Sequence, residues 1–599
     1  MLSNTTIPSS ILSLPSELVL VIFNYVNDYS QLLKLRAAFQ HHKNLSGLVE
    51  CIDSIVFAKI VVSSADDHRH NLHSFVRCDS FNLSTSNDDT QPSMMWVHTT
   101  KERNLSKIIT TNQTCHPLLI DFSDPVELSP FKPYIREIAI NPTPVLENQG
   151  WEEDSHDRQQ QQHGGMKFVE FINSLPSLMS LKINQTLSMN INVPIRHLDI
   201  GNLGNLDYLN LSQLRTLKSQ VRQSLDPYDL PLLTDVTYTL QNLNVNGFHW
   251  SSSGQLERLN IQCMIGQVII NNFTNRYLPC LKKISITSKM FAQRRPKLYL
   301  VDPWDLSTLT HLTISQAVLD PASPISKILN GTSNLQELKL DNVDLKSINY
   351  LNLSEFTKLK KLCLSSNPLP NFEGIELAGS DLEYLEIKHC KVTEIPKFHH
   401  DGGHPPLTSQ FPKLHTVNFS DSQISKIRNL QTLTNLKSLN LSLGNISEVE
   451  NLESLINLEE LIVSTNQISK IDNIRLPKLK VLNLANNFIS RIENLDQAPM
   501  LQQLDLSNNR ISRIENLDFG LSNLEVLSLN KNKLIKDIGR LQHLKKLKKL
   551  GLARLGVVTG SDAINKITKD NTEVEVELWG TIFEDRLEYG RGKVKRLKR

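Results

Sequence analysis

Hydrophobic residues recur in one pattern along the C-terminal half of the chain. From residue 335 to residue 552 it can be written L-x-x-L-x-L-x-x-N-x-I-x-x-I-x-x-L, and after residue 414 successive copies begin 21 to 23 residues apart. Two clear copies are LKVLNLANNFISRIENL from Leu479 and LQQLDLSNNRISRIENL from Leu501. The alternation of Leu482 and Leu484 predicts a short strand with one buried face. The pair Ile489 and Ile492 predicts a helical or 3₁₀ turn that packs from the other side.

This repeat length and pattern are typical of leucine-rich repeats. One repeat cannot bury its apolar face alone, so stacked repeats bury it together and their strands form a parallel sheet. The sequence therefore predicts an α/β leucine-rich-repeat solenoid, with a curved parallel sheet, short helical or 3₁₀ segments on the convex side and a small N-terminal α-helical module. The asparagine of the pattern, at Asn466, Asn487, Asn509 and Asn532, is expected inside the coil, where its amide satisfies buried backbone groups.

The strand part of the pattern also occurs outside the clear copies. Regular copies start at residues 335, 359, 382, 414, 436, 458, 479, 501, 524 and 547, and weaker ones at 178, 195, 214, 233, 256, 281 and 309. Residues 55–62, 118–122 and 135–140 are expected to be strands as well. TEVEVELW at 572–579 is expected to be a closing edge strand, because its glutamates discourage pairing with another sheet.

A different pattern occupies residues 14–45, LPSELVLVIFNYVNDYSQLLKLRAAFQHHKNL. Pro15 near a helix start, followed by Leu18, Ile22 and Val26 at helical spacing, predicts one short amphipathic helix. The apolar residues from Leu32 to Phe39 predict a second helix after a break. Two such helices have too small a core to stand alone, so they are expected to dock against something.

This stretch resembles an F-box, whose pattern opens Leu-Pro-x-Glu-Leu and continues with Ile-Phe and a Leu-Leu-x-Leu helix. The matching residues are Leu14, Pro15, Glu17, Leu18, Ile22, Phe23, Leu32, Leu33 and Leu35. The resemblance implies that a Skp-type adaptor and a cullin-based ubiquitin ligase are partners, and that Leu14, Pro15, Leu18, Ile22 and Phe23 bind the adaptor. The sequence departs from the family at QHHK (40–43), where a basic residue and a Trp are common. The alternative is that the helices only cap the solenoid.

These patterns divide the chain into successive segments. The expected segments are a flexible N-terminus (1–13), an F-box-like module (14–50), divergent early coils (51–176) with a disordered loop (147–166), irregular repeats (177–334), regular repeats (335–556) with an inserted loop (397–410), and a C-terminal cap with a basic tail (557–599). The loop prediction rests on a glutamine tract without apolar periodicity.

Charge and cysteine content narrow the class of protein. The 64 basic and 62 acidic residues give a net charge of +2, which supplies no whole-chain attraction to nucleic acid or an anionic membrane. The seven cysteines contain no C-x-x-C and no regular spacing, which favours free thiols in a reducing compartment. No signal peptide or membrane span is recognised near the N-terminus. We expect a cytoplasmic protein, with a nuclear location left open by the basic tail GRGKVKRLKR.

Catalytic and metal motifs are missing from the sequence. It contains no phosphate-binding G-x-x-x-x-G-K-[ST], no G-x-S-x-G and no H-E-x-x-H, so no enzyme activity and no cofactor are expected. The histidines of HHDGGH (399–404) lie in a glycine-rich loop without an obvious fourth ligand, and we interpret them as solvated. Binding of a protein is the expected activity.

The repeat indicates where that binding occurs. The third, fifth and seventh residues of each L-x-x-L-x-L-x-x-N phrase are expected to point away from the core, onto the concave face of the arc. Ten coils with strands about 4.8 Å apart give a surface on the order of 45 Å long. Most of it is small and polar, and two patches stand out. The candidate partner-binding residues are Tyr384, Glu386, Lys388, Glu460, Ile462, Val481, Asn483 and Asp505.

The ISRIENL coils also resemble those of the regulatory subunit of type 1 protein phosphatase, which repeats at 22 residues. The match is good from 414 to 540 and concerns core positions. That regulator holds its phosphatase with acidic and aromatic residues on the inner face, where this chain has chiefly Asn, Ser and Thr. Two hypotheses follow. The first is an F-box-type substrate receptor that holds an unknown protein substrate on its concave face, and the second is a repeat scaffold or phosphatase regulator without a ubiquitin role.

Overall fold

The computed structural model of the chain describes residues 331–398, 411–517, 521–556, 559–571 and 574–578, with strands and short segments between residues 59 and 329. Four predicted features therefore lie outside the described residues. They are the F-box-like module (14–50), the loop at 147–166, most of the inserted loop at 397–410 and the basic tail.

The chain forms two compact units. One contains residues 1–241 and 249–259, and the other contains residues 242–248 and 260–599. The strands of the first unit include β1 (Lys59–Ser63), β2 (Val97–Thr99), β3 (Leu118–Asp121), β4 (Glu137–Ile140), β5 (Ser180–Ile183), β6 (His197–Ile200), β7 (Thr216–Val221) and β8 (Asp235–Leu240). The three early segments that were expected to be strands are confirmed as β1, β3 and β4.

The early strands of the first unit do not pair in the order of the sequence. β1 pairs in parallel with both β3 and β4, and β2 pairs with β3. From β4 to β8 each strand pairs in parallel with the next. The regular succession of a solenoid therefore begins at β4, one strand before the first weak copy of the leucine pattern at residue 178.

The second unit carries one long parallel sheet in which each coil supplies a strand. In chain order these strands are β12 (Lys283–Ser288), β14 (His311–Ser315), β16 (Glu337–Asp341), β17 (Lys361–Cys363), β18 (Tyr384–Glu386), β19 (Thr416–Asn418), β20 (Ser438–Asn440), β21 (Glu460–Ile462), β22 (Val481–Asn483), β23 (Gln503–Asp505), β24 (Val526–Ser528), β25 (Lys549–Gly551) and β26 (Glu575–Glu577). Neighbours pair in register, as Leu461 does with Leu482 and Leu482 with Leu504. Every strand predicted from a copy starting at 281 or later is confirmed, including the closing strand β26, and β10 (Arg258–Cys263) corresponds to the copy at 256.

A second parallel sheet was not anticipated from the sequence. It consists of β9 (Val245–Asn246), β11 (Gln267–Ile270), β13 (Lys297–Leu300) and β15 (Val318–Leu319), which pair in that order. These coils are longer than the regular ones, and their apolar segments QVII and KLYL are long enough to form a second strand where a short turn was expected. Helical convex segments occur later, as the 3₁₀ helices η7 (Ile348–Leu351), η8 (Leu353–Glu355), η9 (Ile375–Leu377) and η10 (Gly539–His543).

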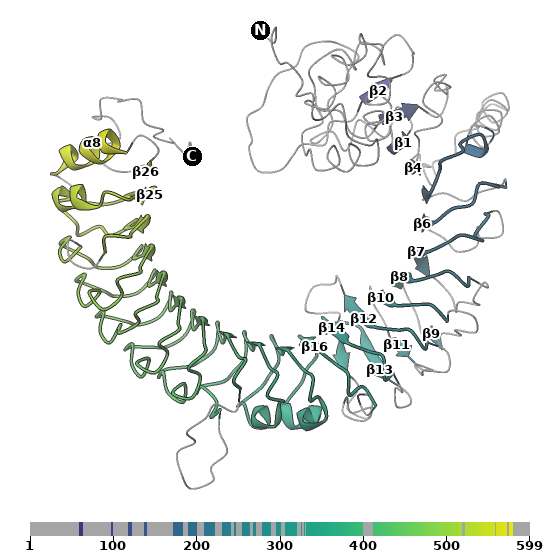
Figure 1. Cartoon of the computed structure of the whole chain (residues 1–599), viewed down its shortest axis with the longest axis horizontal. Helices are drawn as coiled ribbons and strands as arrows, with labels where there is room; N and C mark the ends of the chain where they lie inside the picture. Colours follow the sequence, from purple (N-terminus) through teal and green to yellow (C-terminus); the bar gives the residue numbers. More distant parts are fainter. Residues whose placement is uncertain are drawn as a thin grey trace, which may run out of the picture. The chain divides into compact units, whose positions relative to one another are not determined.

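The coils between residues 411 and 517 have turns and bends on their convex side and no helix among their described residues. Figure 1 shows the strands of these coils along the inner side of the arc. The leucines and isoleucines of the pattern fill the space between the two sides, and Leu479, Leu482, Leu484, Ile489 and Ile492 all have no solvent exposure. Truncating one such leucine to alanine typically costs about 2–5 kcal/mol.

A row of buried asparagines binds successive coils together, as predicted. Asn487 donates from Nδ2 to the carbonyl oxygens of Val463 at 3.1 Å and Leu484 at 3.0 Å, and its Oδ1 accepts from the N–H of Ile468 at 3.0 Å. Asn466, Asn509 and Asn532 make the equivalent contacts, and Asn367 extends the row to an earlier coil. Each amide therefore satisfies backbone groups of two coils at once.

A second row of asparagines on the other side of the coils was not predicted. The Asn of I-x-x-I-x-N-L adopts a left-handed conformation in five coils, with φ of 57° at Asn473 and 58° at Asn494. Asn494 Nδ2 donates to the carbonyl oxygen of Ile471 at 2.8 Å, and Asn473 Nδ2 donates to that of Val449 at 3.0 Å. Asparagine suits this position because it tolerates a positive φ and its amide reaches the preceding coil.

The helix α8 (Ser561–Asp570) is the convex element between the last two strands, β25 and β26, and it packs against η10. Its buried face consists of Ala563, Ile564 and Ile567, whose spacing is that of one helix face. Gly560 precedes the helix with φ of 97°, and a Cβ there would lie 2.7 Å from the backbone nitrogen of Gly539. Only glycine fits this close approach between α8 and η10.

Candidate functional site

The concave face is built from the outward residues of the short strands. In β18 to β22 the middle residue is buried and the residues on either side are half-buried. Because neighbouring strands pair in register, the third-position side chains form one row and the fifth-position side chains form another. The predicted residues of β18 and of β21 to β23 all lie on these two rows, except Lys388, which follows β18 by two residues.

The first predicted patch is held together by hydrogen bonds around one carboxylate. Tyr384 Oη donates to Glu386 Oε2 at 2.7 Å, and Lys388 Nζ lies 3.2 Å from Glu386 Oε1. Ser365 Oγ, from the preceding coil, donates to the same Oε1 at 3.2 Å. The Glu386 side chain is 13% exposed, so the structure brings Tyr384, Glu386 and Lys388 together as one preorganised group.

These contacts shift the pKa values of both Tyr384 and Glu386. Burial and the hydrogen bond to Glu386 raise the pKa of the Tyr384 phenol above its ordinary value. Burial by itself raises the pKa of Glu386, but the hydrogen bonds from Tyr384 and Lys388 outweigh it and leave that pKa below its ordinary value. Glu386 is therefore charged and Tyr384 is a neutral hydrogen-bond donor at neutral pH.

The charged group continues across earlier strands of the same unit. Lys361 Nζ lies 5.2 Å from the centre of the Tyr384 ring and 3.2 Å from Glu337 Oε1. His311 Nε2 is 3.9 Å from Glu337 Oε2, but burial and nearby Lys283 lower the pKa of His311, so its imidazole is neutral at pH 7. The row from β16 to β18 thus alternates negative and positive groups around one tyrosine.

The second predicted patch is more apolar. Glu460 pairs with Val481 across β21 and β22, and Ile462 pairs with Asn483. Glu460 Oε2 accepts a hydrogen bond from Ser438 Oγ at 2.6 Å, which holds the carboxylate toward β20. Ile462 and Val481 are half-buried and leave aliphatic surface facing the concave side. An exposed aliphatic pair beside a positioned carboxylate is suited to a protein partner.

Asn483 and Asp505 have a structural role that the sequence analysis did not foresee. Asn483 Oδ1 accepts from the N–H of Ala485 at 3.0 Å, and Asp505 Oδ1 accepts from the N–H of Ser507 at 2.9 Å. Asn440 makes the same bond to Ser442 at 3.0 Å, where an N-x-S triplet recurs in the sequence. Each of these residues closes a turn at the end of its strand, so one of its polar atoms is already used by the backbone.

Cys363 is a buried residue within the strand rows. It occupies an outward strand position between Lys339 and Glu386, yet it is 3% exposed. Burial and the nearby Glu386 carboxylate raise the pKa of its thiol to about 12, so it remains protonated. Cys390 takes the asparagine position of its coil, and its Sγ lies 3.4 Å from the carbonyl oxygen of Lys388.

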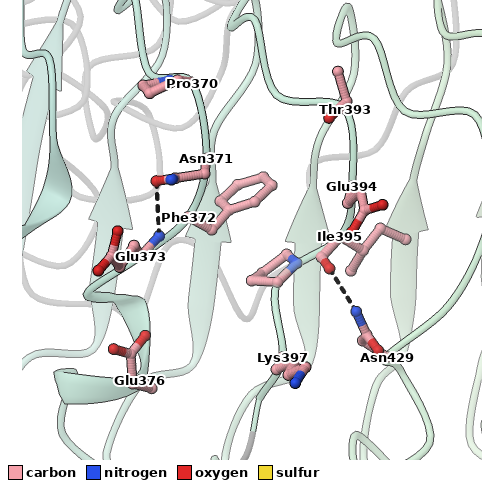
Figure 2. A pocket seen from close by; sticks show the side chains of 11 residues that line it. Pro370, Asn371, Phe372, Glu373, Glu376, Thr393, Glu394, Ile395, Lys397 and Asn429 are labelled. Carbon is pink, nitrogen blue, oxygen red and sulfur yellow. Dashed lines mark hydrogen bonds between the residues drawn. The ribbon is translucent and has the colours of Figure 1, made fainter.

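A cleft of about 490 Å³ opens away from the strand rows, beside the base of the inserted loop. Its lining residues are Pro370, Asn371, Phe372, Glu373, Glu376, Thr393, Glu394, Ile395, Pro396, Lys397 and Asn429. Figure 2 shows Asn371 bonded to the backbone of Glu373 and Asn429 bonded to the Ile395 carbonyl. Its polar lining consists of Asn371, Glu373, Glu376, Thr393, Glu394, Lys397 and Asn429, and it contains no histidine, cysteine or serine.

The described residues contain no helix long and apolar enough to span a bilayer. They also contain no cluster of three or more His, Cys, Asp or Glu residues placed to hold a metal ion. The predicted adaptor-binding residues and HHDGGH lie outside the described residues. Cysteines 263, 280, 363 and 390 are free thiols.

Comparison with protein families identifies the repeat. A family described as leucine-rich repeats (two copies) matches residues 456–497 and 499–546, which include β21 to β24. The C-terminal coils are therefore leucine-rich repeats, and the fold is a leucine-rich-repeat solenoid with a parallel sheet, as predicted. No curated protein matches the chain.

Solved structures similar to this chain include three repeat proteins. The functional domain of InlJ from Listeria monocytogenes is 19% identical with a TM-score of 0.38, covering 51% of this chain and 59% of that domain. TLR13 in its ssRNA13 complex is 17% identical with a TM-score of 0.43, covering 75% of this chain and 72% of that one. A leucine-rich-repeat protein of Leptospira interrogans is 20% identical with a TM-score of 0.41, covering 64% and 95%. This chain thus spans 59% of the InlJ domain.

Proposed function

We propose that this protein binds a partner protein on the concave face of its C-terminal coils. The observation that carries the proposal is the row of positioned side chains on that face, above all the Tyr384, Glu386 and Lys388 group. These side chains are held in place before a partner arrives, so binding loses little side-chain entropy. Solenoids characteristically use such extended concave surfaces for binding.

We further propose that the bound partner is a substrate for ubiquitin transfer. The support is the F-box-like pattern at residues 14–45, with Leu14, Pro15, Leu18, Ile22 and Phe23 as the adaptor-binding residues. In this arrangement the N-terminal helices hold a Skp-type adaptor of a cullin complex, and the repeats hold the substrate. The protein is a receptor that brings two proteins together and performs no chemistry itself.

Co-purification tests the ubiquitin part of the proposal. A tagged full-length chain is expected to recover a Skp-type adaptor, and the double variant Leu14→Ala/Ile22→Ala is expected to lose it, because two apolar anchors are removed. The matched control is Leu541→Ala, which truncates an equally apolar but buried residue of the last coils. Adaptor recovery that is unchanged in the double variant would show that the helices are only a cap.

The repeat scaffold without a ubiquitin role is the other outcome. A protein phosphatase recovered in place of the adaptor, and lost in the variant Glu460→Lys/Ile462→Ser, would favour the phosphatase regulator. Both residues lie on the concave face of β21, where Glu460 supplies a carboxylate to the second patch.

A further inference from the structure

One junction between neighbouring coils lacks the asparagines that join the others. From β16 to β24, every described junction except one is crossed by an amide from at least one of the two asparagine rows. The exception lies between the coil of β17, which starts at residue 359, and the coil of β18, which starts at residue 382. In the coil of β18, Cys390 takes the position of the first row and Lys397 takes that of the second. We call this contact the β17–β18 junction.

Backbone groups at the β17–β18 junction are left without partners. In a regular coil Asn487 Oδ1 accepts from the N–H of Ile468, and the carbonyl oxygen of Ile468 accepts from the N–H of Phe488 at 2.8 Å. The residue equivalent to Ile468 is Leu369, which has no solvent exposure. Within the part of the chain that the structure describes, neither the N–H nor the carbonyl oxygen of Leu369 is hydrogen-bonded. Cys390 has no side-chain oxygen that could accept from this N–H.

The outer side of the same junction is hollow. The cleft of about 490 Å³ takes one wall from residues 370–376 of the β17 coil and the other from residues 393–397 of the β18 coil. Figure 2 shows these two groups of residues on opposite sides of the cleft. Where the cleft lies, side chains of the two coils do not pack against each other, so less dispersion attraction holds the coils together.

The concave side of the junction is bonded in the regular way. The N–H of Leu364 donates to the carbonyl oxygen of Glu386 at 2.9 Å, and that of Ser366 donates to the carbonyl oxygen of Lys388 at 2.7 Å. Ser365 Oγ also donates to the Glu386 carboxylate at 3.2 Å. The two coils are thus joined firmly along their strands and weakly on the outer side. This asymmetry is that of a hinge whose axis follows the strands.

We propose that the β17–β18 junction is a hinge at which the C-terminal solenoid bends. Opening the outer side brings water to the N–H and the carbonyl oxygen of Leu369, which offsets part of the cost of opening because unpaired polar groups are penalised in the closed form. The rings of Phe372 and Phe419 lie 4.8 Å apart, and this apolar contact lacks the directionality of a hydrogen bond. Because each coil contacts chiefly its neighbours, one weak junction is enough to change the curvature of the arc.

The hinge passes through the charged group on the concave face. Lys361 and Ser365 lie on one side of it, and Tyr384, Glu386 and Lys388 lie on the other. Bending therefore changes how the Lys361 ammonium and the Tyr384 ring face each other, and it adjusts the width of the concave face to a partner. This consequence rests on the proposed function, whereas the hinge itself does not.

Pulsed electron paramagnetic resonance on the full-length chain tests the hinge without a partner. One pair of spin labels, carried by unnatural amino acids at exposed Lys346 and Ser447, spans four junctions that include the β17–β18 junction. The matched pair, at exposed Ser425 and Ser512, spans four junctions that each contain an asparagine. We expect the first distance distribution to be about twofold broader than the second. Equal widths in the wild type would overturn the proposal.

Restoring the missing amide is expected to stiffen the junction. His389 has φ of 54°, close to the 56° of Asn486 before Asn487, so Cys390→Asn places an amide in the same turn. We expect this variant to narrow the distribution of the first pair toward that of the matched pair. We also expect it to slow hydrogen exchange of the Leu369 amide about tenfold, because that N–H gains an acceptor.

The control for the restored amide is Cys390→Ala, which removes the thiol without supplying an acceptor. It is expected to leave both the distance distribution and the exchange rate close to those of the wild type. A distribution that stays broad in folded Cys390→Asn, or one that Cys390→Ala narrows equally, would contradict the hinge. The comparison of the two label pairs in the wild type decides the matter if Cys390→Asn does not fold.

Discussion

The buried asparagines at the turns hold the coils together through bonds that no aliphatic residue can make. Replacing Asn487 with alanine removes its donors to Val463 and Leu484 and leaves the N–H of Ile468 unpaired in the core. We expect Asn487→Ala to lower the free energy of unfolding by about 2–3 kcal/mol. Urea denaturation measures this change, and Asn445→Ala, at an exposed turn, is the control with a change within about 0.5 kcal/mol. Equal effects would contradict the role of the asparagine row.

Leu443 is a residue whose conformation does not suit its side chain. It has φ of 59° and is 49% exposed, whereas the equivalent residues of later coils include Asn486 and Asn508. We expect Leu443→Asn to raise the free energy of unfolding by about 0.5–1 kcal/mol, because asparagine adopts a positive φ at lower cost. The urea midpoint checks this, and a lower midpoint would count against the assigned backbone conformation.

Glu386 gives the concave face a pH dependence. Its folded-state pKa is depressed, so its stabilising contribution is present above the ordinary pKa and is lost as the pH falls through the lower folded value. We expect Glu386→Gln to lower the free energy of unfolding on the order of 1 kcal/mol at pH 7, with a difference that narrows below about pH 4. Urea titrations at both pH values measure it, with exposed Glu448→Gln as the control. A difference that is independent of pH would refute the assignment.

The roles of some of these residues could be predicted from the sequence, and those of others could not. The turn asparagines were predictable because one residue type recurs at one position. Asn483 and Asp505 were assigned to a partner, and the structure also gives each a bond to the backbone two residues later. The available signal was an Asn or Asp at the fifth position of several coils, as at Asn440, Asn483 and Asp505, which sequence alone does not separate from a polar residue that faces a partner.

At the level of elements, strands were easier to predict than the connections between them. The L-x-x-L-x-L phrase located the strands of the sheet because alternating apolar and polar residues indicate a strand with one buried face. The sheet formed by β9, β11, β13 and β15 was not predicted because its strands are only two to four residues long. Segments that short do not show a clear alternation of apolar and polar residues. The extension of the Tyr384, Glu386 and Lys388 patch to Lys361 and Glu337 was not predicted either, because those residues come from two earlier coils.

The junction between η10 and α8 depends on one glycine. Gly560→Ala would place a Cβ 2.7 Å from the backbone nitrogen of Gly539 at a φ of 97°. We expect it to lower the free energy of unfolding by about 1–3 kcal/mol. The control is Gly254→Ala, where an added Cβ would have no atom within 4 Å. Thermal unfolding of both variants tests this, and similar midpoints would show that the junction tolerates a side chain.

At the level of the whole molecule, the consensus residues determine the fold, and we propose that the residues between them bind the partner. The aliphatic positions are buried and repeat from coil to coil, so they cannot specify a partner. The residues at the positions of Tyr384, Glu460 and Ile462 vary between coils and face the concave side. The identity of a partner could not be predicted from the sequence because recognition uses the positions that the repeat leaves free.

The central claim is that the concave face holds a partner protein independently of the N-terminal helices. Quantitative co-purification of the tagged full-length chain tests it most directly, with Leu14→Ala/Ile22→Ala and Tyr384→Ala/Ile462→Ser compared with the wild type. We expect the Leu14→Ala/Ile22→Ala variant to lose the adaptor and keep the protein bound on the concave face. We expect the Tyr384→Ala/Ile462→Ser variant to lose that protein and keep the adaptor. Recovery of the same proteins in the same amounts from the concave-face variant and the wild type would contradict it.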